Sequence, residues 1–146
     1  HWFKLNEFYD EVQRIIKADG IIAAWCYNKF RTDDPELNLI VDKLHQLITN
    51  PNVLHQSRKY VHEEYKTIPF PFKKITTPNF YMTETVDYDF LINYLETYPG
   101  IIELRQNNGN KNIDVLYQEL KKLWGHSKQK NKLIWPLYLL VAKVNS

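Results

Sequence analysis

The fold of this chain is decided by the stretch Gly20-Ile21-Ile22-Ala23-Ala24-Trp25-Cys26-Tyr27. The apolar run after Gly20 shows no polar-apolar alternation, which is typical of a strand buried on both faces in a helix-covered sheet. In residues 6–19 apolar side chains recur every three or four positions, which predicts a helix with Gly20 as its left-handed C-terminal cap. A helix, a glycine and a buried strand form the second half of a parallel β-α-β unit, so we expect a strand upstream of His1.

The rest of the chain also alternates helical and extended patterns. Asp33-Asp34-Pro35 places a capping carboxylate before a proline, which favours a helix start. Two prolines in Thr67-Ile68-Pro69-Phe70-Pro71-Phe72 exclude a helix and a central strand there, and predict an extended aromatic loop. Three strands for about five helices indicate an α/β fold that needs further strands. We expect helices near 35–49, 57–65, 88–98 and 113–124, and strands near 79–86 and 133–144.

Composition excludes several classes of protein. The 146 residues are 44% hydrophobic and 25% charged, which is typical of one globular domain or a piece of one. The net charge of +2 lacks the basic excess of a nucleic-acid binder. The longest apolar run, Ile134–Ala142, contains Pro136 and falls far short of the roughly 20 residues that span a bilayer. A single cysteine, Cys26, and no signal peptide favour a reducing, cytoplasmic location.

Several short motifs occur in one order along the whole chain. The first is His1-Trp2-Phe3, and the strand Ile21–Tyr27 ends in Trp-Cys-Tyr. The others are Tyr65-x-x-Ile68-Pro69-Phe70-Pro71-Phe72, Tyr94-Leu95-x-Thr97-Tyr98, Leu123-Trp124-Gly125 and Trp135-Pro136-Leu137. Together they resemble the class I S-adenosylmethionine-dependent methyltransferases, in the branch similar to trans-aconitate methyltransferase. The turn Lys17-Ala18-Asp19-Gly20 departs from that branch's lysine-proline-glycine-glycine, and Tyr98 stands where tryptophan is more common.

The resemblance implies an α/β fold that is the C-terminal part of a Rossmann-like methyltransferase sheet. Residues 1–146 would supply about three strands with flanking helices, and the N-terminal half would be absent. The absent half would hold the glycine-rich turn that binds the cofactor, S-adenosylmethionine. Because this chain has no Gly-x-Gly pair, we expect it to bind the cofactor weakly or not at all and to be inactive alone. The complete protein would methylate a small molecule, with a carboxylic acid as one such acceptor.

The motif His1-Trp2-Phe3 provides the first candidate site residues. The resemblance puts it at the carboxyl end of a sheet strand, where ligands bind in this architecture. His1 is therefore our candidate catalytic general base, and the alternative is a positioning or hydrogen-bonding role. Trp2 and Phe3 are the candidate cofactor-binding residues, with packing of the strand end as the alternative. The five histidines show no spacing typical of a metal site, so no metal is expected.

The candidate substrate-binding residues come from two further segments. Alternation places Trp25 and Tyr27 on one side of their strand, with the thiol of Cys26 on the other side as a buried group rather than a nucleophile. Residues 60–72 are predicted to form a substrate lid within an insertion at about 31–74. The lid would bind substrate through Tyr65, Phe70 and Phe72, and the alternative is a surface loop pinned by hydrophobic contacts.

Two other functions stay open at this point. The chain could be a non-catalytic ligand-binding or assembly module that is complete at 146 residues. A nucleic-acid methyltransferase is the second alternative, which the weak net charge disfavours. With its neighbouring strand absent, the strand Ile21–Tyr27 would have an exposed edge, which predicts a homodimer through that edge. Neither a nucleic-acid nor a membrane partner is expected.

Overall fold

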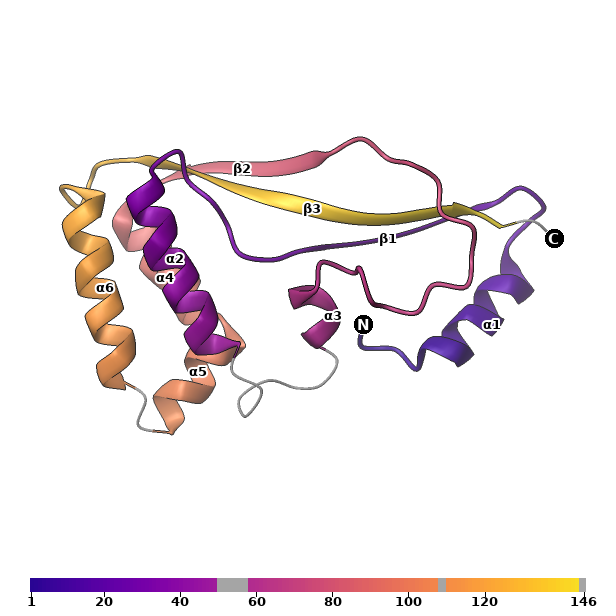
Figure 1. Ribbon diagram of the computed structural model, residues 1–146, viewed down its shortest axis with the longest axis horizontal. Helices are drawn as coiled ribbons and strands as arrows, with labels where there is room; N and C mark the ends of the chain where they lie inside the picture. Colours follow the sequence, from indigo (N-terminus) through magenta and orange to yellow (C-terminus); the bar gives the residue numbers. More distant parts are fainter. Residues whose placement is uncertain (50–57, 108–109, 145–146) are drawn as a thin grey trace. The chain divides into compact units, whose positions relative to one another are not determined.

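A computed structural model describes residues 1–49, 58–107 and 110–144 of the chain. Figure 1 shows helices and strands interleaved along the chain, as an α/β fold requires. The strands β1, β2 and β3 form an antiparallel sheet in the order β1-β3-β2. The helices are α1 (Leu5–Ile15), α2 (Pro35–Ile48), α3 (Lys59–His62), α4 (Tyr88–Glu96), α5 (Pro99–Gln106) and α6 (Asn110–Trp124), and the strands are β1 (Ile21–Tyr27), β2 (Phe80–Val86) and β3 (Asn131–Lys143).

The chain divides into two compact units. The first unit comprises the described residues within His1–Asn28, Gln56–Tyr81 and Pro136–Ser146. The second unit comprises those within Lys29–His55 and Met82–Trp135. The predicted insertion at about 31–74 is therefore divided between the two units. The predicted helix at 57–65 is four residues long in the described part, and its first residue, Ser57, lies outside the described residues.

In the first unit, β1 pairs with β3 along its whole length, from Ile21 opposite Lys143 to Tyr27 opposite Leu137. One face of this pair is covered by α1 and by residues 60–72 (Figure 1). The buried side chains of that face alternate along the strands, and they are Ile22, Cys26, Leu140 and Ala142. The alternation follows from the two-residue period of a strand.

The prediction that β1 is buried on both faces is wrong for the described chain. Its burial alternates, and on the second face Ile21, Trp25 and Tyr27 are 57%, 63% and 48% exposed. The physical reason is that α1 and residues 60–72 pack on a single face of the strand pair. An apolar run shows that both faces of a strand carry apolar side chains. It does not show which segments of the chain pack on each face.

The turn between α1 and β1 also differs from the prediction. The left-handed residue is Asp19, with a φ of 63°, and not Gly20. A short polar side chain such as that of aspartate tolerates this conformation. Gly20 is needed for a different reason, since an added Cβ would lie 2.4 Å from Cγ1 of Ile16 and 2.9 Å from the carbonyl oxygen of Lys17.

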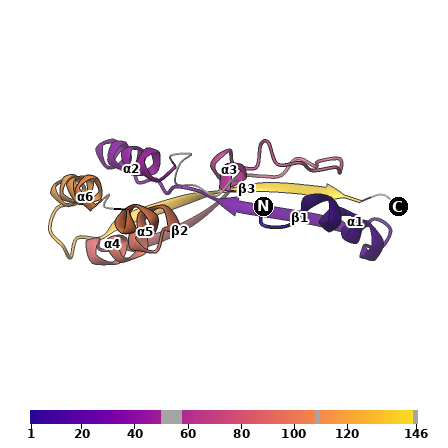
Figure 2. The same ribbon diagram turned by 90° about the horizontal axis from the view of Figure 1, so that it is seen from below.

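The second unit is a helical layer built by α2, α4, α5 and α6 around one apolar core. Figure 2 views these helices nearly end-on, with α2 beside α6 and α4 beside α5. Their apolar stripes meet, and the most completely buried side chains are those of Leu91, Ile101, Ile113, Trp124 and Leu133. The tertiary packing of these stripes, rather than helix propensity, stabilises helices of this length.

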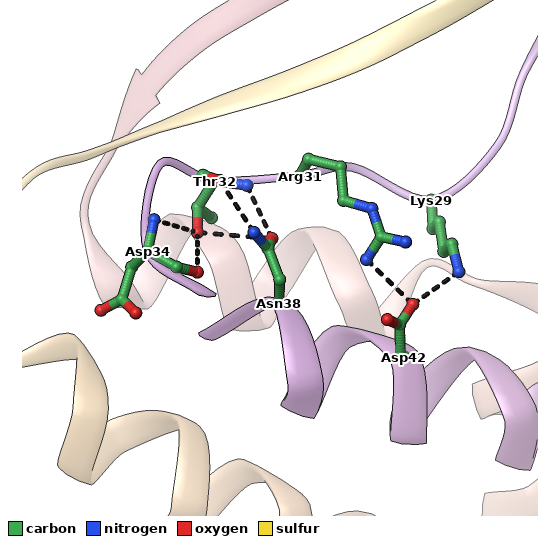
Figure 3. A network of polar contacts seen from close by, with 6 residues as sticks. All are labelled: Lys29, Arg31, Thr32, Asp34, Asn38 and Asp42. Carbon is green, nitrogen blue, oxygen red and sulfur yellow. Dashed lines mark hydrogen bonds and ion pairs between the residues drawn. The ribbon is translucent and has the colours of Figure 1, made fainter. Parts of the chain in front are cut away.

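Capping residues fix where these helices begin. The Asp34 carboxylate accepts hydrogen bonds from the backbone N–H groups of Glu36 and Leu37, and Pro35 follows as predicted. Figure 3 shows Asp34 next to Thr32 and Asn38, and Asp42 between Lys29 and Arg31. Asp87 caps α4 in the same way, through the N–H of Phe90. Helix α5 was not predicted, because a proline at position 99 fits both the end of the helix predicted at 88–98 and the first residue of a new helix.

An ion network ties together α4, α5 and α6. The Arg105 guanidinium donates to Glu96 at 2.6 Å and to Asp114 at 2.9 Å. It also lies 5.7 Å from the ring centroid of Tyr117. The hydrogen bonds from Arg105 hold the pKa of Glu96 below its ordinary value. A carboxyl group with a lowered pKa stabilises the fold above its unfolded pKa of about 4.3, and this contribution is lost as the pH falls through the folded pKa.

The stability of the second unit should therefore decrease below about pH 5, in part through Glu96. We expect Glu96→Gln to lower stability at pH 7 by roughly 1 kcal/mol or less, because the pair is about one-third exposed. The variant should also flatten the pH dependence of the urea midpoint between about pH 5 and 3. Glu103→Gln is the control, since the Glu103 carboxylate accepts from the neutral amide of Asn107. Equal slopes for wild type and Glu96→Gln would contradict this assignment.

Candidate functional site

The first unit brings together two of the predicted site residues, His1 and Tyr65. The Nδ1 atom of His1 lies 3.0 Å from the hydroxyl oxygen of Tyr65, across 64 positions of sequence. The Tyr65 side chain is 6% exposed and packs among Cys26, Val61 and Leu140. The imidazole ring also lies 4.9 Å from the indole of Trp2. A titratable ring is thus held between a buried phenol and an exposed aromatic side chain.

Burial sets the protonation states next to His1. Burial raises the pKa of Tyr65, and Cys26 and Tyr9 raise it further. The pKa of the Cys26 thiol is raised to about 12, mainly by burial and then by the nearby Glu64 carboxylate. Both groups are therefore protonated at neutral pH. A thiol in this state is a poor nucleophile, which agrees with a packing role for Cys26.

Trp2 and Phe3 present aromatic surface to solvent. Their side chains are 61% and 64% exposed. Phe3 lies 5.0 Å from the ring of Phe8, and the guanidinium carbon of Arg58 lies 5.7 Å from the centre of a Trp2 ring. The Arg58 guanidinium thus lies over the Trp2 ring, and most of the Trp2 and Phe3 side-chain surface stays in contact with solvent.

The proline segment is fixed to α1 by aromatic packing. Tyr9 lies edge-on to Phe70 and Phe72, with ring centroids 6.1 and 5.5 Å away, and its hydroxyl donates to the carbonyl oxygen of Pro69 at 2.6 Å. Phe70 and Phe72 are half-buried. The helical pattern marked Tyr9 as an apolar residue of α1, and nothing in the local sequence marked this hydrogen bond to a residue 60 positions away.

The structure does not bring Trp25 and Tyr27 to the other predicted substrate residues. They lie on the second face of β1, whereas Tyr65 packs against Cys26 on the first face. This separation follows from the strand period that places Trp25 and Tyr27 on the same side. The lid and the substrate roles of Tyr65, Phe70 and Phe72 stay predictions.

Two further features bear on ligand binding. A cavity of about 20 Å³ lies within the second unit among α2, α4 and α5, lined by Val41, Leu95 and Ile101 among others. It has room for about one water molecule, so it is far too small for a nucleoside. In the part of the chain that the structure describes, no three histidine, cysteine, aspartate or glutamate side chains gather as metal ligands would. Nor is any helix of the described ranges both long and apolar enough to cross a bilayer.

Comparisons with known proteins fit this architecture. A solved structure, "The Structure of a Putative Type II Methyltransferase from Anaeromyxobacter dehalogenans", superimposes with a TM-score of 0.86 at 27% sequence identity. The match covers 99% of this chain and 61% of that one. The chain has a methyltransferase fold. A Dictyostelium discoideum protein named "Putative methyltransferase" is 22% identical over 98% of this chain and 56% of its own length. No family model matches the chain.

The chain covers only part of the length of the proteins that it resembles. It spans 56% of the length of the Dictyostelium discoideum protein and 61% of the length of the Anaeromyxobacter dehalogenans structure. The methyltransferase fold that the resemblance implies is confirmed, whereas the trans-aconitate methyltransferase branch and the assignment to a C-terminal half stay predictions.

Proposed function

We propose that the complete protein transfers a methyl group from S-adenosylmethionine to a small molecule, with carboxylic acids as the first acceptor class to test. The observation that carries the proposal is the superposition on a methyltransferase-named structure over 99% of the chain, with a TM-score of 0.86. The order of sequence motifs, similar to the trans-aconitate methyltransferase branch, supports the finer assignment to that branch. The single buried thiol of Cys26 supports a reducing, cytoplasmic location.

The residues of this chain fit one wall of the proposed cofactor site. Trp2 and Phe3 offer exposed aromatic faces against which an adenine or the methionine portion could stack. The glycines of this chain occur singly, and Gly20 and Gly125 lie at a turn and a helix end. The tight glycine-rich turn of a nucleoside site would therefore come from chain outside this sequence. When bound, S-adenosylmethionine supplies a methyl group already activated on a sulfonium.

The sheet also supports the proposal that further strands of the domain come from chain outside this sequence. Strand β1 lies at an edge of the sheet that the described residues form, and its uncovered face carries Ile21, Trp25 and Tyr27. Antiparallel strands at one end of an otherwise parallel sheet are common in doubly wound folds. We therefore infer that residues 1–146 are the C-terminal part of a Rossmann-like sheet whose remaining strands lie beyond β1.

The chain's own contribution to the reaction would be alignment, exclusion of water and proton removal. Aromatic groups such as Trp2 exclude water from the reacting atoms. His1 would accept a proton from the acceptor, or hold the acceptor by a hydrogen bond where no proton must leave. An ionised carboxylate acceptor needs no base, whereas a hydroxyl or amine does.

Binding of S-adenosylmethionine tests the proposed division. By calorimetry, the complete protein should bind the cofactor at least 100-fold more tightly than residues 1–146 alone. The complete protein should also transfer radioactive methyl groups from S-adenosylmethionine to a member of a panel of small carboxylic acids, alcohols and amines. Equal affinity of the two proteins would contradict the division of the site. Absence of cofactor binding by the complete protein would contradict the proposed function.

A second candidate function is assembly, and the free edge of β1 favours it. Backbone groups of β1 that do not pair with β3 lie beside exposed Ile21, Trp25 and Tyr27. Such an edge is a template for another strand. If residues 1–146 exist as a separate protein, we propose that two copies pair through this edge as a homodimer.

A further inference from the structure

The turn that carries Tyr65 has an unusual backbone. Glu64 and Tyr65 are consecutive non-glycine residues, and both have a φ of 58°. The left-handed region is unfavourable for a residue with a Cβ, and more so for a bulky aromatic residue. Such conformations persist only where the surrounding structure holds them, and they concentrate at functional sites.

Backbone hydrogen bonds hold this turn at the end of α3. The N–H of Glu64 donates to the carbonyl oxygen of Val61 at 3.0 Å, and the N–H of Tyr65 donates to that of Tyr60 at 2.8 Å. The N–H of Lys66 donates to the carbonyl oxygen of Glu63 at 2.9 Å. The Tyr65 ring is then fixed by packing against Val61, Ile68 and Leu140. A buried ring on a clamped backbone has little freedom, so the position of its hydroxyl group is defined.

That hydroxyl group faces the imidazole of His1. The two polar atoms, Nδ1 of His1 and the Tyr65 hydroxyl oxygen, are 3.0 Å apart. In a neutral histidine one ring nitrogen carries the proton, and the hydrogen bond made by that nitrogen determines the tautomer. A tyrosine hydroxyl can donate or accept a hydrogen bond, and where it accepts from Nδ1–H, Nε2 is left without a proton and can accept one.

We propose that Tyr65 is a positioning residue for His1. The Nδ1–H of His1 donates to the Tyr65 hydroxyl oxygen, so that Nε2 is free to take up the proton that the methyl acceptor loses. The inference rests on the proposed function and deepens it. In the step, the O–H or N–H bond of the acceptor breaks and its proton forms a bond to Nε2. The electron pair left on the acceptor atom forms the bond to the transferred methyl group, and the sulfonium sulfur keeps the pair of its broken bond. The hydrogen bond between Nδ1 and Tyr65 persists throughout.

Other titratable and charged groups near this pair define the background of a pH measurement. Cys26 and Glu64 interact electrostatically with each other on the Tyr65 side. Arg58 lies over the ring of Trp2, and the ring of Trp2 lies beside that of His1. Tyr9 interacts with Tyr65 from α1. The thiol and both phenols keep their protons near neutral pH. Burial lowers the pKa of the α-amino group of residue 1, and burial together with Arg58 lowers the pKa of His62.

Nitrogen NMR of the complete protein, labelled with ¹⁵N-histidine, tests the proposal directly. The His1 signals are identified by their loss in His1→Gln. In the wild type we expect a protonated Nδ1 and an unprotonated Nε2, and in Tyr65→Phe a mixture of tautomers. The His1 pKa should also fall by about one unit in Tyr65→Phe, roughly tenfold in proton affinity, because the imidazolium loses an acceptor. Tyr81→Phe, which removes an exposed hydroxyl group on β2, should change neither readout.

Turnover provides the second arm of the experiment. With an alcohol or amine acceptor from the panel, Tyr65→Phe should lower kcat about ten- to a hundredfold and leave the affinity for S-adenosylmethionine within twofold. A Tyr65→Phe variant with an unchanged His1 tautomer and pKa would overturn the proposal, even if it unfolds more easily. If no acceptor is methylated but the tautomer changes as expected, the proposed function fails while the His1–Tyr65 hydrogen bond stands.

Discussion

Replacing Leu91 with alanine is expected to lower the free energy of unfolding of the second unit by about 2–5 kcal/mol. Leu91 lies in α4, is 0% exposed and belongs to the apolar core shared by α2, α4, α5 and α6. Truncation removes buried methyl groups and leaves a cavity that the surrounding helices fill only in part. Urea unfolding followed by tryptophan fluorescence measures the change, because Trp124 and Trp135 belong to the same core.

Leu39→Ala is the matched control for this prediction. Leu39 lies in α2 of the same unit, and its side chain is 62% exposed. Both substitutions remove the same atoms from a helix, and both gain the same intrinsic helix propensity. Leu39→Ala should therefore change stability by no more than about 0.5 kcal/mol. Similar losses for the two variants would mean that the helical layer does not pack as described.

Local signals in the sequence predicted most of the elements. The carboxylate of Asp34 caps the helix that was predicted to start there, and the carboxylate of Asp87 caps α4 in the same way. Gly125, at the end of α6, has a φ of 94°. These features depend on neighbouring residues only, which is why a sequence can show them. Pro99 is a local signal with two meanings, since a proline can follow the end of one helix or begin the next, and the helix α5 that begins there was not predicted.

Features set by distant residues were not predictable in this way. The antiparallel register of β1 with β3 joins residues more than a hundred positions apart. The contact between His1 and Tyr65 depends on a turn in which two non-glycine residues are left-handed, and residue types give no signal of such a turn. The sequence therefore supplied His1 and Tyr65 as separate candidates, and the packing of the first unit supplied their relation.

His1→Gln should produce the largest loss of activity of any variant considered. With an acceptor that must lose a proton, we expect kcat of the complete protein to fall about 10²- to 10⁴-fold, which is the usual contribution of a general base. Glutamine keeps a polar side chain that can hydrogen-bond to Tyr65 but cannot take up a proton. Binding of S-adenosylmethionine should stay within a fewfold of wild type, since alignment by Trp2 and Phe3 is unaffected. His126→Gln, at an exposed loop position, is the control.

The acceptor decides what the loss in His1→Gln means. A carboxylic acid is ionised at neutral pH and presents an oxygen that needs no base, so the variant should lose no more than about tenfold with such an acceptor. An alcohol or an amine should show the full loss. Comparing the two acceptor classes in one variant therefore separates proton removal from positioning. An equal and large loss with both classes would show that His1 orients the acceptor, and loss with neither class would remove His1 from the site.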